Sequence, residues 1–389
     1  MPEKTRIMSL KKFANLIRTK NEWNEILSYT HNLKGKVIQN LNFVHENIDW
    51  EKLNTKGATF LGCEFQKGDA VHLISNGALV YPKFSKLPYN PHRFGLYTWQ
   101  ELMDSETDNI HDTSDLKIYN HFVHTKYNPP MDEAMAQRIH DYAIDVALRN
   151  MIEYDEFGMT QKKIVGFMGG HATRRGSEYY VKVALAAKRL SEKGYFVATG
   201  GGPGVMEAAN LGAYFGNHKD EELHDAIKIM SDLKFEGDDL RDYFAVNYFT
   251  RAKAVLGKYP EGKENLAIPT WFYGHEPSNL FASHIAKYFS NSIREDTLLA
   301  ICLYGIIYAP GSAGTTQEIF QEAAQNHYGT FGYYSPMIFL GKKRYIEDTA
   351  LYSVLHQLAV GMPYKELLYL TDDPELAVDF IETHPPVKV

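Results

Sequence analysis

Three glycine-rich turns, each placed between an apolar run and a helical pattern, constrain the fold of this chain more than any other feature. The last of them follows the apolar residues 305–309 and reads Pro310-Gly-Ser-Ala-Gly314, with a helix-forming sequence directly after it. Gly311 and Gly314 let the backbone turn tightly and approach a ligand closely, because glycine has no Cβ. The free N–H groups of the first helical turn then point at that ligand, so the turn is suited to binding an anion such as phosphate.

The same arrangement occurs twice earlier in the chain. An apolar run, a glycine turn and a helical pattern follow one another at 163–168, 169–176 and 177–193, and again at 194–199, 200–204 and 205–214. Strands that alternate with helices in this way favour a parallel sheet. The sequence therefore predicts an α/β fold with a doubly wound parallel sheet and a ligand at the carboxyl ends of its strands. The alternative, that each cluster is only a turn, explains one cluster better than it explains all three.

These turns do not match two common nucleotide-binding motifs. A G-x-G-x-x-G dinucleotide fingerprint that begins at Gly200 and Gly202 would need its third glycine where this chain has Val205. A Walker motif with a terminal Gly-Lys-Ser/Thr does not occur in the sequence. The sequence thus argues against NAD binding and against ATP hydrolysis.

The two later turns resemble the paired motifs of a known family. Gly200-Gly-Gly-Pro-Gly-Val-Met-Glu207 and Pro310-Gly-Ser-Ala-Gly-Thr-Thr-Gln-Glu318 are similar to G-G-G-x-x-G-x-M and P-G-G-x-G-T-x-x-E of the Lonely Guy (LOG) family, whose members often carry the label lysine decarboxylase-like. The resemblance covers residues 161–389 and implies a Rossmann-like fold and a homo-oligomer. It also implies hydrolysis of the N-glycosidic bond of an AMP-like nucleoside 5′-monophosphate to a free base and ribose 5-phosphate, without a cofactor.

The chain departs from the family pattern at two points. Ser312 stands where the family usually has its second glycine, and we expect it to fit there if its φ is negative, with its hydroxyl as an added phosphate donor. The family also carries an arginine shortly before the proline of its second motif, and here Arg294 lies sixteen residues before Pro310. Arg251 is the alternative arginine, although a solvated helix face is the better explanation for it.

Glycosidic chemistry gives two residues a role. Breaking a ribose–base bond passes through an oxocarbenium-like sugar, which a nearby carboxylate can stabilise while it also orients or deprotonates the attacking water. We assign this role to Glu318, which without the motif would be explained equally well as a first-turn acid beside the helix dipole. We expect Arg294 to contact the nucleotide and to keep Glu318 ionised by lowering its pKa.

The predicted binding residues come from four turns. The candidates around the phosphate are Gly200, Gly201, Gly202, Gly204, Gly311, Ser312, Ala313, Gly314, Thr315 and Thr316. Gly170 and His171 of the first turn, together with Arg174 and Arg175, are candidates for phosphate or base contact, although an exposed basic loop explains this turn equally well. Glu276 and Asn279 follow another apolar run, so we expect them at the ligand edge of the sheet, where they can bind ribose hydroxyls.

The amino-acid composition limits the kinds of ligand and cellular setting that we expect for this chain. The net charge of −7 argues against broad nucleic-acid binding, which needs a basic face, whereas one local anion site is enough for a free nucleotide. The two cysteines and the lack of an apolar amino-terminal stretch indicate a reducing, cytoplasmic setting, and the longest apolar runs are too short to span a membrane. None of the sixteen histidines falls in a metal-ligand pattern, so no metal site is indicated.

The chain length suggests two domains. The predicted parts are an amino-terminal region (1–125), a helix that leads into the next domain (126–160) and a LOG-like nucleotide-binding catalytic domain (161–389). In the first region, residues 9–31 are expected to be helical, and the segments between 37 and 65 are similar to pentapeptide-repeat coils. The five-residue register breaks too soon to predict a solenoid. A regulatory, capping or assembly role for this region stays open.

Three function classes follow from these observations. The first is a nucleoside-monophosphate hydrolase. The second is a non-catalytic nucleotide sensor or regulatory protein, in which the same pocket binds a ligand and the amino-terminal region reports it. The third, amino-acid decarboxylation, is disfavoured because a pyridoxal enzyme needs a Schiff-base lysine beside a phosphate cup, and neither glycine motif contains a lysine.

Overall fold

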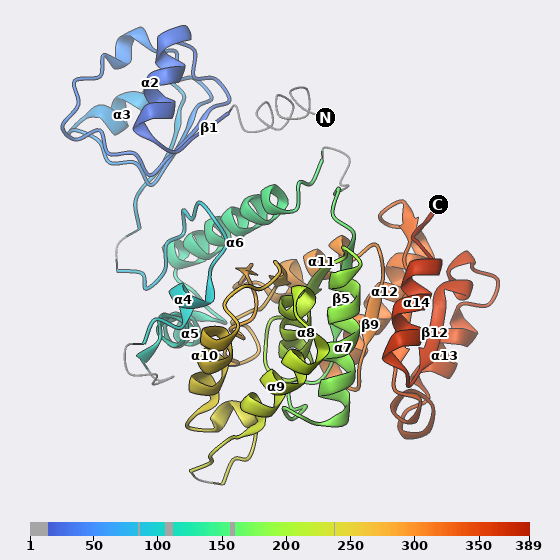
Figure 1. Cartoon of the computed structure of the whole chain (residues 1–389). Coiled ribbons are helices and arrows are strands. Elements are labelled where there is room, and N and C mark those ends of the chain that lie inside the picture. The colour runs from blue at the N-terminus through green and yellow to red at the C-terminus, as the bar shows by residue number, and fades with distance from the viewer. Residues whose placement is uncertain (1–14, 85, 106–111, 156–159, 237) are drawn as a thin grey trace. The chain divides into compact units, whose positions relative to one another are not determined.

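The computed structural model describes residues 15–84, 86–105, 112–155, 160–236 and 238–389 (Figure 1). The chain forms two compact units. The first comprises Met1–Arg93 and Pro130–His140, and the second comprises Phe94–Pro129 and Asp141–Val389. The second unit thus includes residues 94–125 of the predicted amino-terminal region together with all of residues 161–389.

A seven-stranded parallel sheet lies at the centre of the second unit. Its strands are β5 (Ile164–Met168), β6 (Phe196–Thr199), β7 (Leu266–Ala267), β8 (His284–Ile285), β9 (Ile306–Tyr308), β11 (Met337–Leu340) and β12 (Leu368–Thr371). They lie in the order β12-β11-β9-β5-β6-β7-β8, and every neighbouring pair is parallel. The predicted α/β fold with a Rossmann-like, doubly wound parallel sheet is confirmed.

The strand order reverses at β5. From β5 the chain adds β6, β7 and β8 on one side, and it then returns to place β9 on the other side of β5. In open α/β sheets a ligand binds in the crevice at the carboxyl ends of the strands, where the order reverses in this way. Here those ends are Met168 and Tyr308, which lie opposite each other in the register and lead into the first and last glycine turns.

Helices surround this sheet in the second unit. They are α4 (Trp99–Leu102), α5 (Ser114–Thr125), the part of α6 (Met131–Met151) from Asp141 onward, α7 (Glu178–Glu192), α8 (Val205–Tyr214), α9 (Asp220–Ser231), α10 (Tyr248–Lys258), α11 (Asn291–Ile301), α12 (Ala313–Tyr328), α13 (Leu351–Leu358) and α14 (Pro374–Thr383). Helix α7 packs against α8 and α14, whereas α11 packs against α12 and β5 (Figure 1). All residues of β5, β9 and β11 are buried, as expected for parallel strands that helices cover on both faces.

The first unit contains a parallel sheet built from repeated coils. Strands β1 (Leu16–Ile17), β2 (Val37–Gln39), β3 (Thr59–Leu61) and β4 (Leu79–Tyr81) pair in chain order. Leu16, Val37, Thr59 and Leu79 lie side by side, so consecutive coils are offset by 21, 22 and 20 residues. The chain does coil repeatedly in this region, but offsets of 21 and 22 residues are not multiples of five, so a five-residue register cannot be followed from one coil to the next.

Aromatic side chains fill the interior of these coils. Trp23 of helix α2 (Lys20–Tyr29) lies 5.1 Å from Phe43, Phe43 lies 5.6 Å from Trp50, and Trp50 lies 5.9 Å from Phe60, measured between ring centroids. Such contacts between different coils stabilise a stack that no single coil could hold.

The helix predicted for residues 9–31 is shorter than expected. Residues 9–14 lie outside the described residues, and Leu16 and Ile17 form β1 because they pair with β2. Helix α2 begins at Lys20, where Thr19 and Glu22 form a capping box, and it ends at Tyr29. The sequence prediction therefore extended the helix over residues that form β1 and the N-terminal cap of α2.

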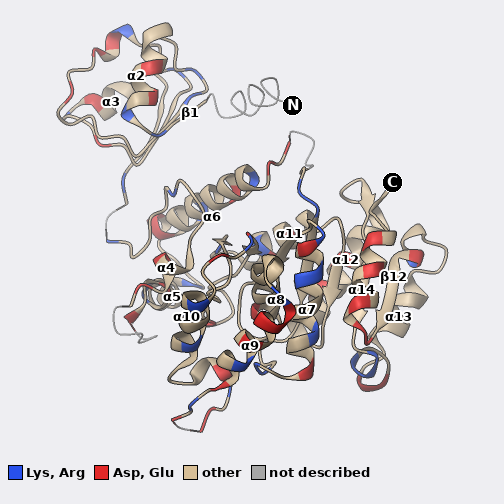
Figure 2. Ribbon diagram, viewed as in Figure 1, with Lys and Arg blue, Asp and Glu red and all other residues tan. Residues whose placement is uncertain are grey.

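Acidic and basic residues alternate along the helices of the second unit in the ribbon of Figure 2. This distribution accompanies the net charge of −7. Within the described ranges, no helix is both long enough and apolar enough to cross a lipid bilayer.

Candidate active site

The three glycine turns meet at the carboxyl ends of β5, β6 and β9. The Gly170 amide donates to the Pro310 carbonyl at 3.0 Å, and the Val205 amide donates to the Gly170 carbonyl at 3.1 Å. Gly204 has a φ of +70°, and a Cβ on it would lie 2.4 Å from the Gly170 oxygen. A side chain is therefore excluded at Gly204 both by its backbone conformation and by the neighbouring turn. The turns form one continuous backbone surface.

Glu318 and Arg294 face each other beside this surface. Arg294 comes from α11 and Glu318 from α12, each side chain is buried with 8% of the residue exposed, and Arg294 Nη1 lies 3.7 Å from Glu318 Oε1. Arg294 Nε also donates to the Ile268 carbonyl at 2.7 Å, directly after β7. A Cβ on Gly200 would lie 2.5 Å from Arg294 Nη2, so the guanidinium packs against the second glycine turn. Arg294 thus touches β7, the turn after β6 and Glu318.

Arg251, the alternative arginine, lies elsewhere. It belongs to α10 and pairs with Asp232, a mostly exposed residue, while its Nε donates to the Asp232 carbonyl at 3.0 Å. The structure places Arg294, and not Arg251, beside Glu318.

The pKa of Glu318 moves in the opposite direction from the one expected. Burial raises it, Arg294 lowers it and Glu295 raises it further, so that the pKa of Glu318 reaches about 7. The arginine acts with the predicted sign, but the cost of desolvating the carboxylate outweighs it. Near neutral pH, Glu318 therefore populates both its ionised and its protonated form, which suits a group that exchanges protons during a reaction.

The predicted phosphate turn begins α12. Ser312 is the N-cap residue, and its φ of −112° is negative, as a serine at this position requires. Ser312, Ala313 and Gly314 are exposed, and a Cβ on Gly314 would meet no atom within 4 Å. Thr315 is buried, and the Thr316 hydroxyl donates back to the Ser312 carbonyl at 3.0 Å. The exposed amides of this first turn are open to an anion.

Glu276 and His171 lie at the rim of the same surface. His171 Nδ1 is 3.3 Å from Glu276 Oε1, and both side chains are partly exposed. A Cβ on Gly202 would lie 3.1 Å from Glu276 Oε2, so Glu276 sits next to the second glycine turn. These contacts bring Glu276, His171 and Gly202 together, although they come from three separate loops.

Asn279 lies deeper than the ribose-binding prediction assumed. It is fully buried, its Nδ2 donates to the Gly201 carbonyl at 3.1 Å and to Asn210 Oδ1 at 2.8 Å, and its backbone amide donates to the Gly201 carbonyl at 3.0 Å. These bonds fix Gly201, which has a φ of +76°. The contacts of Asn279 thus hold the second glycine turn in shape.

Arg175 is a core residue rather than part of an exposed basic loop. Its Nε and Nη2 donate to the two carboxylate oxygens of Glu207 at 2.8 and 2.6 Å. Tyr180 and Tyr248 donate to the same carboxylate at 3.0 and 2.8 Å. This network joins the first glycine turn to α8, and the sequence hinted at it only through the position of Glu207 at the end of the motif of residues 200–207.

Sequence reasoning missed a polar chain next to Arg294. Asn291 Nδ2 donates to Glu295 Oε2 at 2.6 Å and to the Tyr273 hydroxyl at 3.0 Å. Asn291, Arg294 and Glu295 are spaced by three and four residues along α11, so they share one helix face. That spacing, around an arginine already singled out, was the available signal.

Helix α5 fixes the loop after β7. Asp115 in its first turn is fully buried, accepts a hydrogen bond from Trp271 Nε1 at 2.9 Å and lies 2.7 Å from Lys287 Nζ. Burial raises the pKa of Asp115, but Lys287 and His275 together outweigh it and lower that pKa to about 2. The ionised Asp115 therefore anchors both ends of the segment between Trp271 and Lys287, which carries Glu276.

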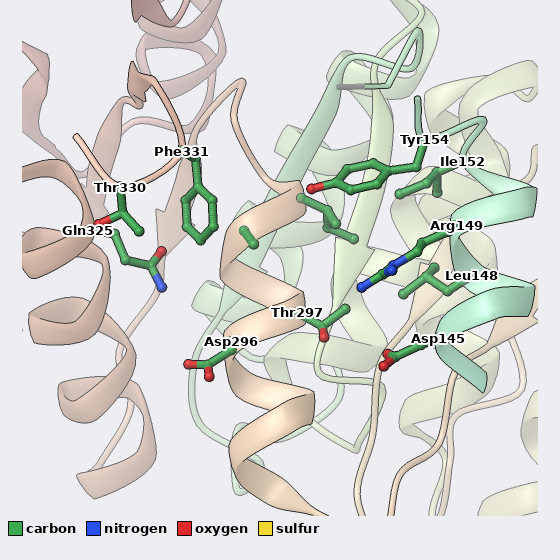
Figure 3. Close-up of a pocket in the computed structure, with 12 residues that line it drawn as sticks. Asp145, Leu148, Arg149, Ile152, Tyr154, Asp296, Thr297, Gln325, Thr330 and Phe331 are labelled. Atoms are coloured by element: carbon green, nitrogen blue, oxygen red, sulfur yellow. The ribbon is translucent and has the colours of Figure 1, made fainter. Parts of the chain in front are cut away.

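A separate pocket of about 430 Å³ lies on another side of α11 (Figure 3). Its lining residues are Asp145, Leu148, Arg149, Ile152, Tyr154, Asp296, Thr297, Ala300, Ile301, Gln325, Thr330 and Phe331. Asp296 and Thr297 point into it from α11, whereas Arg294 and Glu318 do not line it. Helix α11 therefore presents different residues to this pocket and to the glycine turns.

Comparison with known proteins gives only distant structural similarity. No family model matches the sequence, and no curated protein matches it. The fold is similar to that of the Moco carrier protein from Chlamydomonas reinhardtii, with 15% identity, coverage of 57% of this chain and 97% of the other, and a TM-score of 0.34. The molybdenum cofactor binding protein from Rippkaea orientalis gives 15% identity, coverage of 58% and 98%, and a TM-score of 0.33.

Proposed function

We propose that this chain hydrolyses the N-glycosidic bond of a nucleoside 5′-monophosphate, releasing a free base and ribose 5-phosphate. The observation that carries the proposal is the Arg294–Glu318 pair at the meeting point of three glycine turns. The resemblance of residues 200–207 and 310–318 to the two LOG motifs supports the same reaction.

The proposed reaction uses the phosphate to place the sugar. The 5′-phosphate binds the exposed first turn of α12, at Gly311 to Thr316, so that the ribose lies against Glu318. Ionised Glu318 stabilises the positive charge that develops on the sugar and accepts a proton from the attacking water as the C1′–O bond forms. The C1′–N bond breaks, its electron pair goes to the base, and the base takes up one proton from solvent, which balances the proton passed from the water to Glu318.

The surrounding residues support these two groups. Arg294 opposes the effect of burial, so that a usable fraction of Glu318 is ionised at neutral pH. Glu276 at the rim is placed to bind a ribose hydroxyl, and Asn279 holds Gly201 in position. Gly200, Gly202 and Gly204 let the backbone approach Arg294, Glu276 and the first turn.

The test is base release from AMP, GMP, CMP, UMP and IMP without added metal, followed by chromatography of the base and of ribose 5-phosphate. We expect release by the natural protein and its loss in Glu318→Gln. Glu322→Gln is the matched control, because Glu322 is a buried carboxylate on the same helix whose partner is Ser335.

The outcome also separates the second function class. Tight binding of a nucleotide without release of base would overturn the hydrolase proposal and favour a nucleotide sensor. Release that persists in Glu318→Gln would leave hydrolysis standing and remove Glu318 from its proposed role.

A further inference from the structure

Glu295 is a second buried carboxylate beside the Arg294–Glu318 pair. It follows Arg294 on α11, and only 3% of it is exposed. Among the described residues, no cation lies within ion-pair distance of its side chain, and Asn291 Nδ2 is the donor that reaches Glu295 Oε2, at 2.6 Å. A buried carboxylate without a cation costs free energy, so its retention at this position calls for an explanation.

Asn291 connects Glu295 to the opening of the site. The same Nδ2 donates to the hydroxyl of Tyr273, which is 62% exposed and belongs to the loop that carries Glu276. Burial is the main cause that raises the pKa of this phenol, Glu295 and Glu318 raise it further, and Arg294 lowers it. The chain from Tyr273 through Asn291 to Glu295 therefore runs along the same wall as Arg294 and Glu318.

Titratable groups from several elements lie near Glu318. Arg294 and Glu295 of α11 shift its pKa, whereas Tyr273, in the loop after β7, lies close enough for Glu318 to raise the pKa of the phenol. Tyr308 of β9 and Tyr345 of the π-helical turn Lys343–Asp348 also lie within electrostatic reach of it. Of these groups, Glu295 is the other carboxyl group, and it raises the pKa of Glu318.

We propose that Glu295, held by Asn291, is a positioning residue of this site, which acts on the reaction through Glu318. Its negative charge opposes the ionisation of Glu318, while Arg294 favours it. Glu295 thereby makes Glu318 a stronger proton acceptor, because a carboxylate beside a like charge holds a proton more firmly. The catalytic part of this inference rests on the proposed hydrolysis, whereas the effect on Glu318 titration does not.

The experiment compares two substitutions that remove the same formal charge from the same helix. Glu295→Gln keeps the shape of the side chain and an oxygen for Asn291. Asp296→Asn is the matched control, because Asp296 is the next residue, points into the separate pocket and accepts from Gln321 Nε2 at 2.6 Å (Figure 3). The titration of Glu318 is followed by carbon-13 NMR of glutamate-labelled protein and assigned with Glu318→Gln, and the pH profile of base release is measured on the same samples.

We expect Glu295→Gln to move the Glu318 titration to lower pH by ~0.5–1 unit, since one like charge is removed. The acidic limb of the pH profile should move by the same amount, and Asp296→Asn should move neither. Glu295→Asp keeps the carboxyl group but moves it away from Glu318, because its side chain is one methylene shorter. It should shift the Glu318 titration in the same direction by a smaller amount. It serves as the second variant if Glu295→Gln does not fold.

Two results would overturn the inference. One is an unchanged Glu318 titration in both Glu295 variants, and the other is an equal shift in Asp296→Asn. If no nucleotide is hydrolysed at any pH, the proposed function fails, but the titration still decides whether Glu295 acts on Glu318.

Discussion

The two glycine motifs each end in a glutamate that is paired with an arginine, yet the two pairs differ in how fully the carboxylate is satisfied. Glu207 accepts two bonds from Arg175 and one each from Tyr180 and Tyr248. Glu318 has Arg294 at 3.7 Å, and no hydrogen bond from the described part of the chain reaches its carboxylate. The first pair is a structural brace, because every strong acceptor direction is occupied. In the second pair, the Glu318 carboxylate keeps acceptor positions that no described group occupies.

The comparison shows that two pairs of the same residue types, arginine and glutamate, can have different properties. Burial alone does not make an ion pair functional, since both carboxylates are buried. What distinguishes Glu318 is burial with incomplete pairing, which raises its pKa to about 7 and leaves it responsive to its neighbours. Each prediction below tests one side of the comparison.

The largest effect is expected for Glu318→Gln. If the open pair is the reactive one, base release should fall by roughly 10²- to 10⁴-fold, the range typical for loss of a proton-transferring group. The free energy of unfolding at neutral pH should stay the same or rise, because no strong pair is lost. Turnover kinetics and urea unfolding on the same preparation measure both quantities. A variant that loses stability but keeps its turnover would reverse the assignment.

A substitution in the Arg175–Glu207 pair should instead lower stability. Arg175→Met leaves the Glu207 carboxylate buried without its cation, so we expect the free energy of unfolding to fall by about 3–5 kcal/mol. Arg251→Met is the control, because it removes a guanidinium from the pair with the mostly exposed Asp232 and should cost less than about 1 kcal/mol. Urea unfolding monitored by circular dichroism compares the two. Equal losses in both variants would show that the Glu207 network is no special brace.

The pH dependence of the free energy of unfolding tests the Glu318 side of the comparison. The pKa of Glu318 is about 7 in the folded chain against an ordinary value of 4.5, so the folded chain binds the proton more firmly than the unfolded chain does. Its contribution to stability is therefore full below about pH 4.5 and is lost as the pH rises through about 7.

Comparison with Glu318→Gln isolates this contribution. The difference in free energy of unfolding between the natural protein and the variant should change by on the order of 2–3 kcal/mol between about pH 4.5 and about pH 8, in favour of the variant at high pH. Urea titrations at a series of pH values measure it. If the difference in free energy of unfolding does not change with pH, Glu318 has a pKa near its ordinary value, and its carboxylate is as fully paired as that of Glu207.

The sequence was most informative where neighbouring residues decide the structure. The predicted helices at 177–193 and 205–214 match α7 and α8 within a residue at each end. The glycine turns were recognised for the same reason, because a turn between a strand and a helix depends on a few adjacent residues. From these local patterns the parallel sheet and Glu318 as a candidate site residue could be inferred, whereas its arginine partner came from the resemblance to the LOG family.

Contacts between distant residues could not be inferred. Asp115 and Lys287 are 172 positions apart, and no local pattern indicates that they form a buried pair. The net direction of the Glu318 pKa shift depends on how much water the completed fold excludes, which the motif does not state. Asn279 was assigned from its position after an apolar run, whereas its depth in the fold depends on the packing of Gly201 and Asn210.

The smallest predicted difference concerns one glycine from each motif. Gly204 has a φ of +70°, and a Cβ there would meet the Gly170 oxygen at 2.4 Å, so Gly204→Ala strains the backbone and separates two turns. We expect it to lower the free energy of unfolding by about 1–2 kcal/mol. Gly314 lies in the first turn of α12 with open space around it, so Gly314→Ala should be neutral or stabilising by up to about 1 kcal/mol.

The two glycine variants are matched in chemistry and differ only in surroundings. Thermal unfolding of both, measured side by side, is therefore a direct comparison of the two motifs. A clear loss in Gly204→Ala alone means that the backbone of the first motif is closely packed, like its glutamate, and that the second motif keeps the open space that a substrate needs. Equal losses would instead mean that the exposed turn before Glu318 is as tightly constrained as the brace, which would weaken the case for a phosphate site there.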